Sequence, residues 1–141
     1  MARAEATTAF HLYNPLGLYD PRPNGYSHMA EILPGARLLY IAGQGGEDEQ
    51  GRLSSVFADQ AKQALANLRT ALRSRGADLE DVFKLTLLIV DHDAEKLEHW
   101  VQELTLALRS EMKPVCTLIP VPRLALDGMM IEIDAIAASA I

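Results

Sequence analysis

The chain has 141 residues, of which 49% are hydrophobic and 23% charged, and its net charge is −6. This length suffices for a core without disulfide or metal staples, so we expect a single domain over residues 1–141. The acidic balance argues against a nucleic-acid partner, because phosphates demand concentrated positive charge. The only cysteine, Cys116, leaves no partner for an internal disulfide and no multi-cysteine metal site.

Targeting signals are not expected in this sequence. Residues 1–10 lack the apolar run of about 7–15 residues that a secretory signal needs. No stretch approaches the roughly 18 apolar residues of a membrane span. We therefore expect a cytoplasmic protein with no membrane partner.

The first 25 residues are predicted to form an extended N-terminal arm with turns. Prolines and glycines recur at short intervals in this arm: Pro15, Gly17, Pro21, Pro23 and Gly25. Such spacing prevents a long helix, because proline removes a backbone donor and glycine favours turns.

Two strands are expected next, over residues 26–33 and 37–42, paired as a hairpin around the turn Pro34-Gly35. The glycine-rich, acidic segment 43–51 is predicted to be a loop. Its Gly-Gln-Gly-Gly start lacks both the lysine of a P-loop and the G-x-G-x-x-G spacing of a dinucleotide site. We interpret it as a turn after a strand and not as a phosphate cradle.

The segment after this loop is predicted to be an amphipathic helix. Its apolar residues recur at spacings of three and four from Phe57 to Leu72. Ser54 or Ser55 is placed to cap the start of the helix, and Gly76 is placed to end it.

A buried strand and a second helix follow. Residues 82–90 form an apolar, β-branched run that is typical of a buried strand. Asp93 is expected to cap a helix with an apolar stripe over residues 97–108, and Pro114 blocks its continuation. Two more strands are expected over residues 116–121 and 129–138.

The resulting order, β-β-α-β-α-β-β, predicts an α+β fold. Two helices cannot cover both faces of a sheet of five or six strands, so we expect both helices on one face. The other face would remain partly apolar and would need a partner, which indicates an oligomer.

The last strand separates apolar from acidic residues. Ile131 and Ile133 alternate with Glu132 and Asp134, so the two carboxylates lie on one face. For Asp134 a solvated strand face is the simpler interpretation. A carboxylate in a half-buried cleft can instead hold or move a proton, and we favour that role for Glu132.

Cys116 follows Pro114 at the start of a predicted strand. A buried cysteine usually packs as a small hydrophobe, whereas a nucleophilic cysteine needs a nearby base. The candidate bases are the four histidines, His11, His28, His92 and His99. None of them forms an H-x-x-x-H pair or has a cysteine partner, so no metal site is expected.

Several stretches, in this order, resemble the RidA/YjgF family, also called the endoribonuclease L-PSP family. The matching stretches are residues 14–15, 25–28, 39–44, 60–68, 76–86 and 131–137. The helix motif Q-x-x-x-A-L-x-N-L followed by G-A-x-L-x-D-V-x-K is specific in combination. The resemblance runs from about residue 14 to residue 138.

This resemblance implies a chorismate-mutase-like α+β fold, a mixed β-sheet with two helices packed on one face. It also implies a homotrimer that binds a small-molecule ligand at its subunit interfaces. Active members hydrolyse reactive imines and enamines, such as 2-aminoacrylate, to keto acids and ammonia. The resemblance implies no cofactor and no metal.

Four positions correspond to the family's site residues, and three of them match. Tyr26 matches a tyrosine that lines the pocket, Gly43 a glycine whose backbone helps form the site, and Glu132 the glutamate that positions the attacking water. The family's substrate-binding arginine belongs two residues after a proline, in a P-A-R-[ST] pattern. Here that pattern reads Pro-Val-Cys-Thr over residues 114–117, so Cys116 stands where the arginine belongs.

The replacement weakens carboxylate binding. A guanidinium grips a carboxylate through two charge-assisted hydrogen bonds, whereas a thiol is a weak donor, and the loss costs about 2–5 kcal/mol. Arg123, in the loop beyond the strand, is not expected to reach back. The resemblance therefore implies an imine/enamine deaminase, a hydrolase, that is weak on 2-imino acids, with Glu132 orienting water.

Three alternatives remain open at this point. The trimer could be a non-catalytic metabolite-binding, chaperone-like or regulatory protein. Cys116 could act as a nucleophile or a redox-sensitive thiol. A ribonuclease activity ranks last, because the chain is acidic and its Lys and Arg residues are scattered.

Overall fold

The computed structural model describes residues 8–140. The strands and helices, in chain order, are β1 (Phe10–Tyr13), β2 (Met29–Ile32), β3 (Arg37–Gly45), α1 (Phe57–Arg73), β4 (Val82–Val90), α2 (Ala94–Ala107), β5 (Val115–Val121) and β6 (Ile131–Ser139). Short 3-10 turns, η1 (Arg22–Asn24) and η2 (Leu79–Asp81), precede β2 and β4. The expected arm begins at residue 1, and its residues 1–7 lie outside the described part of the chain.

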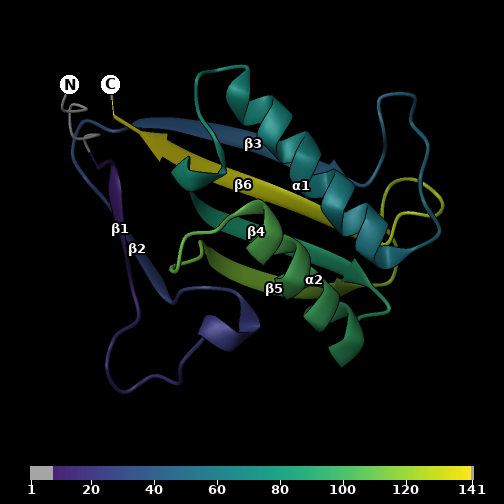
Figure 1. Cartoon of the computed structure of the whole chain (residues 1–141), viewed down its shortest axis with the longest axis horizontal. Helices are drawn as coiled ribbons and strands as arrows, with labels where there is room; N and C mark the ends of the chain where they lie inside the picture. Colours follow the sequence, from purple (N-terminus) through teal and green to yellow (C-terminus); the bar gives the residue numbers. More distant parts are fainter. Residues whose placement is uncertain (1–7, 141) are drawn as a thin grey trace.

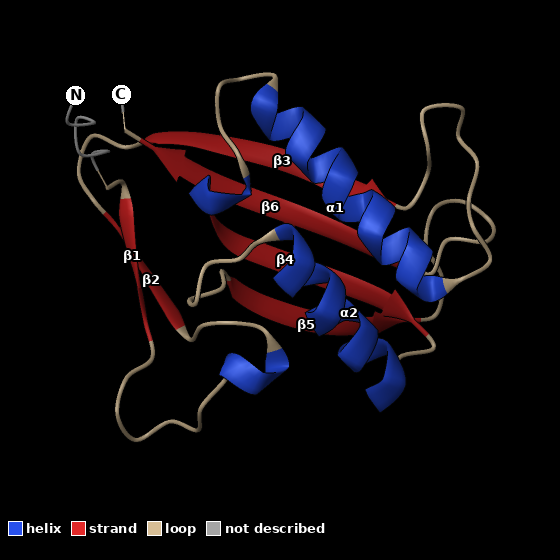
Figure 2. Cartoon of the chain, in the orientation of Figure 1, coloured by secondary structure: helices blue, strands red, loops and turns tan. Residues whose placement is uncertain are grey.

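Within the described residues, β3, β6, β4 and β5 form a four-stranded sheet in that order. The β4–β5 pair is parallel and the other two pairs are antiparallel, so the sheet is mixed. Both helices lie on one face of this sheet, and the β1–β2 ribbon lies beside it (Figures 1 and 2). The predicted α+β class, with two helices on one face of a mixed sheet, is confirmed.

The core lies between the sheet and the two helices. Ile131 and Ile133 of β6 are fully buried there, together with Leu87 of β4 and Leu68 of α1. The opposite, uncovered face of the sheet exposes large apolar side chains, among them Tyr40 with 74% of its surface accessible. The prediction of a partly apolar, uncovered face is therefore confirmed.

The first helix has the predicted apolar stripe but a different start. The residue at the N-cap of α1 is Val56, whose side chain makes no capping hydrogen bond. Ser54 lies earlier, where its hydroxyl accepts a hydrogen bond from the Val56 amide at 3.1 Å and donates to Asp59 at 2.9 Å. The predicted serine cap was wrong, because Ser54 organises the turn before the helix. Gly76, with φ of 75°, follows the end of the helix as predicted.

The second half of the chain follows the sequence prediction closely. The strand predicted over residues 82–90 is β4. Asp93 caps α2, where its carboxylate accepts a hydrogen bond from the Lys96 amide at 2.8 Å. The last two predicted strands are β5 and β6, with their starts shifted by one and two residues.

The predicted hairpin over residues 26–42 was wrong. The turn itself exists, since Gly35 has φ of 80° and the Ala36 amide donates to the Leu33 carbonyl at 3.4 Å. The chain leaves this turn toward the main sheet, so β3 pairs with β6 while β2 pairs with β1. Strand propensity near a turn does not identify the pairing partner. The partner of β3 is β6, which lies at the other end of the described chain.

Two further boundaries differ from the sequence prediction. The arm contains strand β1, which pairs with β2. The segment predicted as a loop from residue 43 is part of β3 up to Gly45, with a register shift between Ile41 and Gln44. The glycines favour a turn by local propensity, but the pairing of Gln44 and Gly45 with β6 keeps the end of this segment in the sheet.

The described residues include no helix that is both long enough and apolar enough to cross a membrane. They also include no cluster of three or more His, Cys, Asp or Glu side chains that could hold a metal ion. These two findings concern residues 8–140 only.

Candidate functional site

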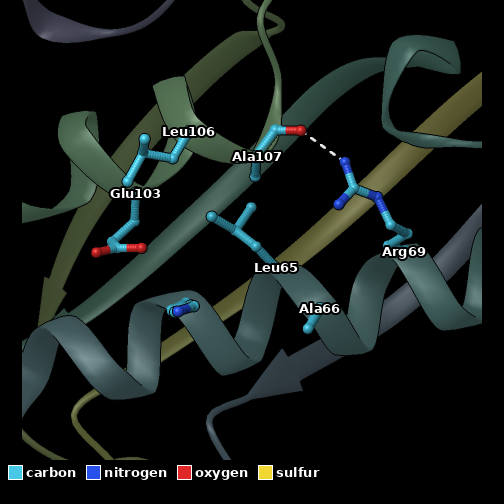
Figure 3. A pocket seen from close by; sticks show the side chains of 7 residues that line it. Leu65, Ala66, Arg69, Glu103, Leu106 and Ala107 are labelled. Carbon is cyan, nitrogen blue, oxygen red and sulfur yellow. Dashed lines mark hydrogen bonds between the residues drawn. The ribbon is translucent and has the colours of Figure 1, made fainter.

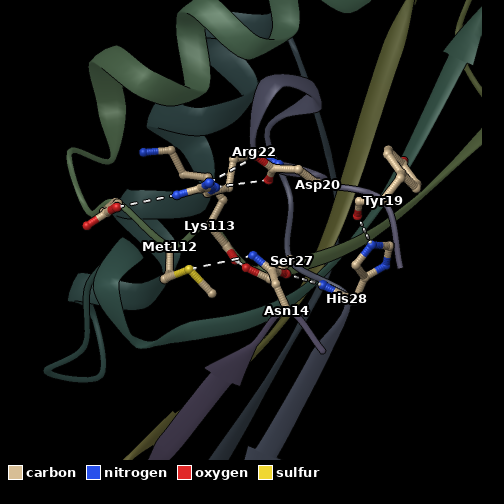
Figure 4. Close-up of polar contacts among 9 residues, drawn as sticks. Asn14, Tyr19, Asp20, Arg22, Ser27, His28, Met112 and Lys113 are labelled. Carbon is tan, nitrogen blue, oxygen red and sulfur yellow. Dashed lines mark hydrogen bonds and ion pairs between the residues drawn. The ribbon is translucent and has the colours of Figure 1, made fainter. Parts of the chain in front are cut away.

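Tyr26 lies beside Cys116 because the next residue, Ser27, extends the sheet at the edge of β5. Ser27 forms a parallel bridge with Val115, and its amide donates to the Pro114 carbonyl at 3.1 Å. The Ser27 hydroxyl, fully buried, donates to the Lys113 carbonyl (Figure 4). Two segments far apart in the sequence are thereby joined, and the structure brings two of the predicted site residues together.

Two further contacts shape the N-terminal arm around Tyr26. The Asn14 side chain accepts a hydrogen bond from the His28 amide at 3.1 Å (Figure 4). Gly25 has φ of 76°, and a Cβ at this position would lie 3.1 Å from Cγ2 of Val101 in α2. Only a residue without a side chain fits this turn easily, so the glycine sets how closely Tyr26 approaches the helix.

The rings of Tyr19 and His28 both lie against the ring of Tyr26. The sequence did not mark Tyr19 as a site residue. The two tyrosine hydroxyls are hydrogen bonded to each other, and this bond raises the pKa of Tyr26 to about 12, with burial as the second cause. His28 Nε2 is 2.8 Å from the Tyr19 carbonyl oxygen (Figure 4). The Tyr26 and His28 rings meet edge-on with centroids 5.5 Å apart. Tyr26 is therefore a neutral, positioned hydroxyl at physiological pH.

Tyr26 and Cys116 open on a cavity of about 410 Å³ on the helix side of the sheet. Its apolar lining consists of Leu87, Leu97, Trp100 and Leu118. Its remaining lining residues have polar or titratable side chains: Asn24, Tyr26, His92, Cys116 and Thr117. None of these lining residues is a lysine, an arginine or a carboxylate. The cavity therefore offers no fixed positive charge to a bound carboxylate.

Cys116 points to the helix side of β5 and packs against the core cluster. Its Cα partner in the adjacent strand is Leu85, which is fully buried. Burial raises the pKa of the Cys116 thiol to about 11; Lys84 lowers it and Asp134 raises it by smaller amounts. The group is therefore a neutral thiol at physiological pH, and this argues against the nucleophilic alternative.

Glu132 and Gly43 meet on the other, uncovered face of the sheet. Glu132 is half-buried and pairs with Gly45 of β3 and Leu88 of β4. A Cβ placed on Gly43 would lie 1.8 Å from Oε1 of Glu132. The carboxylate therefore occupies the space that a side chain at position 43 would need.

Two polar residues of the helix motif fix the segments on either side of this pair. The side chain of Gln60 is fully buried, donates to the Gly128 carbonyl at 2.9 Å and accepts from the Met130 amide at 2.9 Å. Asn67 donates to the Gly45 carbonyl at 3.0 Å. The end of β3 and the start of β6 are therefore both anchored to α1, which positions Glu132.

Within one chain, the four predicted site residues form two separate pairs. Cys116 faces the helices, whereas Glu132 faces away from them, because its neighbours Ile131 and Ile133 are buried in the core. In addition, β4 lies between the strands that carry them. The structure joins Tyr26 with Cys116 but does not join that pair to the carboxylate.

Two further charged residues, Asp134 and Arg123, lie as the sequence predicts. Asp134 is exposed on the uncovered face, as expected for a solvated strand residue. Arg123 lies in the loop after β5, where its exposed guanidinium pairs with Asp127. It does not line the cavity beside Cys116, in agreement with the prediction that it does not replace the missing arginine.

The sequence did not mark His92 or Trp100 as cavity residues. His92 was only one of four candidate bases, and its other signal was its position two residues after the end of β4, because residues at strand ends often face a site. Trp100 was correctly placed on the apolar stripe of α2, but its contact with the cavity depends on how the helix lies over β5. A second cavity of about 290 Å³, between α1 and α2, contains none of the predicted site residues, and its Arg69 is already bonded to the Ala107 carbonyl at 2.6 Å (Figure 3).

Comparisons with known proteins agree with this architecture. A family model described as Endoribonuclease L-PSP matches residues 21–139. A RutC family protein of Pyrococcus horikoshii is 34% identical over 125 residues, which cover 83% of this chain and 90% of that protein. The human 2-iminobutanoate/2-iminopropanoate deaminase is 44% identical over 57 residues, which cover 39% of this chain and 42% of that protein.

A solved structure supports the same family. YyfB of Yersinia pestis, a member of the conserved Rid protein family, superposes with a TM-score of 0.86 at 32% identity, over 92% of this chain and 98% of that one. The fold is therefore the chorismate-mutase-like fold that the sequence resemblance implied. On the match over residues 21–139 and on these relatives, the chain belongs to the endoribonuclease L-PSP family, also called the RidA/YjgF family.

Proposed function

We propose that this protein is a homotrimeric hydrolase that converts a reactive imine to a carbonyl compound and ammonia, in a pocket shared between neighbouring subunits. The observation that carries the proposal is the half-buried carboxylate of Glu132, held over the backbone of Gly43 on the uncovered face of the sheet. The partial similarity to an imine deaminase supports the reaction class.

The proposed chemistry needs only water and a proton acceptor. Glu132 accepts a hydrogen bond from a water molecule and takes up its proton while the water oxygen attacks the imine carbon. The C=N double bond becomes a single bond, and its nitrogen takes up the proton held by Glu132. The hydroxyl group of the tetrahedral intermediate then gives its proton to the nitrogen through Glu132, the C–N bond breaks, and ammonia leaves as the carbonyl group forms. Water supplies the oxygen, and no oxidant or reductant is consumed.

The placement of the two residue pairs supports a shared pocket. The Tyr26–Cys116 pair and the Gly43–Glu132 pair lie on opposite faces of one sheet, so we propose that halves from two subunits complete the site. Leu38, Tyr40 and Ile119 expose apolar surface on the uncovered face, which supports its burial against a neighbouring copy. In this arrangement Tyr26 and Cys116 of one subunit bind the substrate, and Glu132 of the next positions the water.

The proposed substrate is not a simple 2-imino acid. The arginine that would bind a carboxylate is replaced by Cys116, whose thiol stays neutral, and no lysine or arginine lines the cavity. We therefore expect low activity on 2-imino acids and higher activity on an imine without a carboxylate. The expectations of a cytoplasmic location and of no nucleic-acid partner stay predictions.

A second candidate function is metabolite binding without catalysis. The lining of the cavity beside Cys116 favours it, because its walls are partly apolar, hold no lysine, arginine or carboxylate, and can bind small neutral molecules without a reactive group. This candidate predicts a ligand that binds and is not turned over.

The decisive experiment is a hydrolysis assay over a panel of imines. An amino-acid oxidase generates 2-imino acids in the assay, an amine oxidase generates imines without a carboxylate, and the rate of carbonyl formation is followed above the spontaneous rate. An arginine-bearing relative serves as the positive control and Glu132→Gln as the matched negative control. Acceleration by the wild type that Glu132→Gln abolishes, with folding unchanged, supports the proposal. Equal rates for the wild type and the variant on every imine would show that Glu132 has no role in hydrolysis.

A further inference from the structure

Tyr19 lies in the N-terminal arm between β1 and η1, and its side chain contacts Tyr26. The two hydroxyl groups are hydrogen bonded to each other, and the ring centroids are 6.4 Å apart with the ring planes at 61°. Tyr26 lines the cavity beside Cys116, whereas Tyr19 is not one of the lining residues of that cavity. Tyr19 therefore acts on a molecule in this cavity through Tyr26.

The backbone and the ring of Tyr19 are held by His28. Since a carbonyl oxygen can only accept, His28 Nε2 donates a hydrogen bond to the Tyr19 carbonyl oxygen at 2.8 Å (Figure 4). The rings of the two residues meet edge-on, with centroids 5.3 Å apart. The His28 amide in turn donates to the Asn14 side chain at 3.1 Å. These contacts restrict Tyr19, although 59% of its surface is exposed and an exposed side chain ordinarily samples several rotamers.

The bond to Tyr19 fixes the orientation of the Tyr26 hydroxyl group. A phenolic hydroxyl rotates about its C–O bond, donates one hydrogen bond and accepts others. The bond to Tyr19 uses one of these capacities, whichever oxygen donates, and so sets the direction in which the others point. Within residues 8–140 the Tyr26 hydroxyl has no second hydrogen-bond partner, so its remaining capacity is available to a bound molecule. The same bond is the main reason why the pKa of Tyr26 is raised to about 12.

We propose that Tyr19 is a positioning residue of the site, which holds the Tyr26 hydroxyl in one orientation toward the substrate without contacting the substrate itself. Its effect on hydrolysis rests on the proposed function, whereas the state of the Tyr26 hydroxyl can be measured without any turnover. Tyr19→Phe removes the hydroxyl and keeps the ring, so it tests both. The variant should bind substrate more weakly, and its Tyr26 should lose the hydroxyl proton at lower pH.

The first measurement follows the ionisation of Tyr26 directly. The protein is produced with tyrosine labelled with carbon-13 at Cζ, whose NMR signal moves when the hydroxyl ionises. The chain has four tyrosines, and the signal that disappears in Tyr26→Phe is that of Tyr26. At pH 11 we expect Tyr26 to be about one tenth ionised in the wild type and more than about half ionised in Tyr19→Phe. Circular dichroism at pH 11 establishes that both proteins are folded.

The second measurement is the steady-state hydrolysis of an imine without a carboxylate at neutral pH. Tyr19→Phe should raise KM about fivefold and leave kcat within about twofold, because the proposed role of Tyr26 is to bind substrate while Glu132 activates water. In the Tyr26→Phe background, Tyr19→Phe should raise KM no further, because both changes act on one hydrogen bond. The matched control is Leu18→Ala in the same arm, whose side chain is also exposed (56%) and whose KM should equal that of the wild type.

Two results would overturn this inference. One is a Tyr26 signal at pH 11 that is the same in folded wild type and folded Tyr19→Phe, and the other is a KM that Tyr19→Phe does not raise above that of Leu18→Ala. If the protein unfolds at pH 11, the KM comparison at neutral pH decides. If no imine is hydrolysed, the proposed hydrolase is rejected, and the Tyr26 signal still decides whether Tyr19 controls this hydroxyl. Hydrolysis with a KM that Tyr19→Phe leaves unchanged would keep the hydrolase and reject the positioning role.

Discussion

The carboxylate of Glu132 occupies the space in which a side chain at Gly43 would stand, with Oε1 only 1.8 Å from the position of a Cβ at residue 43. Gly43→Ala must therefore displace this carboxylate. The displaced atoms are the end of a flexible side chain, so we expect the melting temperature to change by no more than about 4 °C. The hydrolysis rate should fall at least about tenfold, equivalent to about 1.4 kcal/mol.

Two controls separate this effect from a general loss of stability. Nothing lies within 4 Å of a Cβ at Gly35, whose φ of 80° strains any other residue, so Gly35→Ala should lower stability without touching activity. In the Glu132→Gln background, Gly43→Ala should cause no further loss, because the two changes act on one group. A fully active Gly43→Ala enzyme would show that the carboxylate position is irrelevant.

The uncovered sheet face is expected to be the subunit interface. Tyr40, with 74% of its surface exposed, lies on it beside Leu38. Tyr40→Asp places a charge in the proposed interface, where its desolvation is unfavourable, and should convert the trimer to monomers at micromolar concentration. Sedimentation velocity measures the change. The matched control is Leu106→Asp on α2, also exposed (63%), which should remain trimeric; dissociation of the control alone would place the interface elsewhere.

The raised pKa of Cys116 predicts that its thiol is alkylated slowly and that the stability of the protein depends on pH. Because burial raises this pKa to about 11, alkylation by iodoacetamide at pH 7.5 should be at least about tenfold slower in the folded than in the urea-unfolded protein.

The stability effect has a definite sign. The folded protein holds the thiol proton to higher pH than the unfolded chain, whose thiol titrates near pH 8.5, so the stabilisation is complete below about pH 8.5. It is lost as the pH rises toward about 11. Denaturant titrations of the wild type and Cys116→Ala should therefore converge or cross as the pH rises through this window. Parallel stability curves for the two proteins would contradict the raised pKa.

Restoring the arginine should restore part of the carboxylate selectivity. Cys116→Arg places a guanidinium in the cavity beside Tyr26, where it can form two hydrogen bonds to a 2-imino acid. The apolar walls disfavour a charge, so we expect a gain of about tenfold in kcat/KM on 2-imino acids, equivalent to about 1.4 kcal/mol. Cys116→Met, similar in reach and uncharged, should show no gain. A folded Cys116→Arg protein without any gain would mean that the pocket serves another purpose, and metabolite binding would become the leading function.

Local signals were sufficient to predict the helices and the strands of the second half of the chain. The stripe of α1 and the Asp93 cap depend on residues a few positions apart, and β4 is a continuous apolar run. The pairing of β2 with β1 could not be predicted, because strand register depends on partners distant in the chain. The extension of β3 through Gly45 could not be predicted either, because glycines favour turns and the strand that pairs with this segment, β6, is distant in the chain.

The candidate site was predictable only as separate residues. The family pattern identified Tyr26 and Cys116, but their contact results from the bridge between Ser27 and Val115, which no sequence spacing reveals. The place of His92 on the cavity wall was equally hidden, since it depends on how the connection between β4 and α2 folds.

In the proposed trimer, the separation of the two residue pairs onto opposite faces of one sheet has a genetic consequence. Glu132→Gln would damage one half of each shared site, and Cys116→Phe, which fills the cavity, would damage the other half. Each variant alone would form inactive trimers, but a mixed trimer would contain one site in which both halves are intact. Co-refolding equal amounts should therefore return activity at about one site in four, since random assembly of a cyclic trimer makes most rings mixed. Two alleles that are each null could in this way complement one another within a single cell.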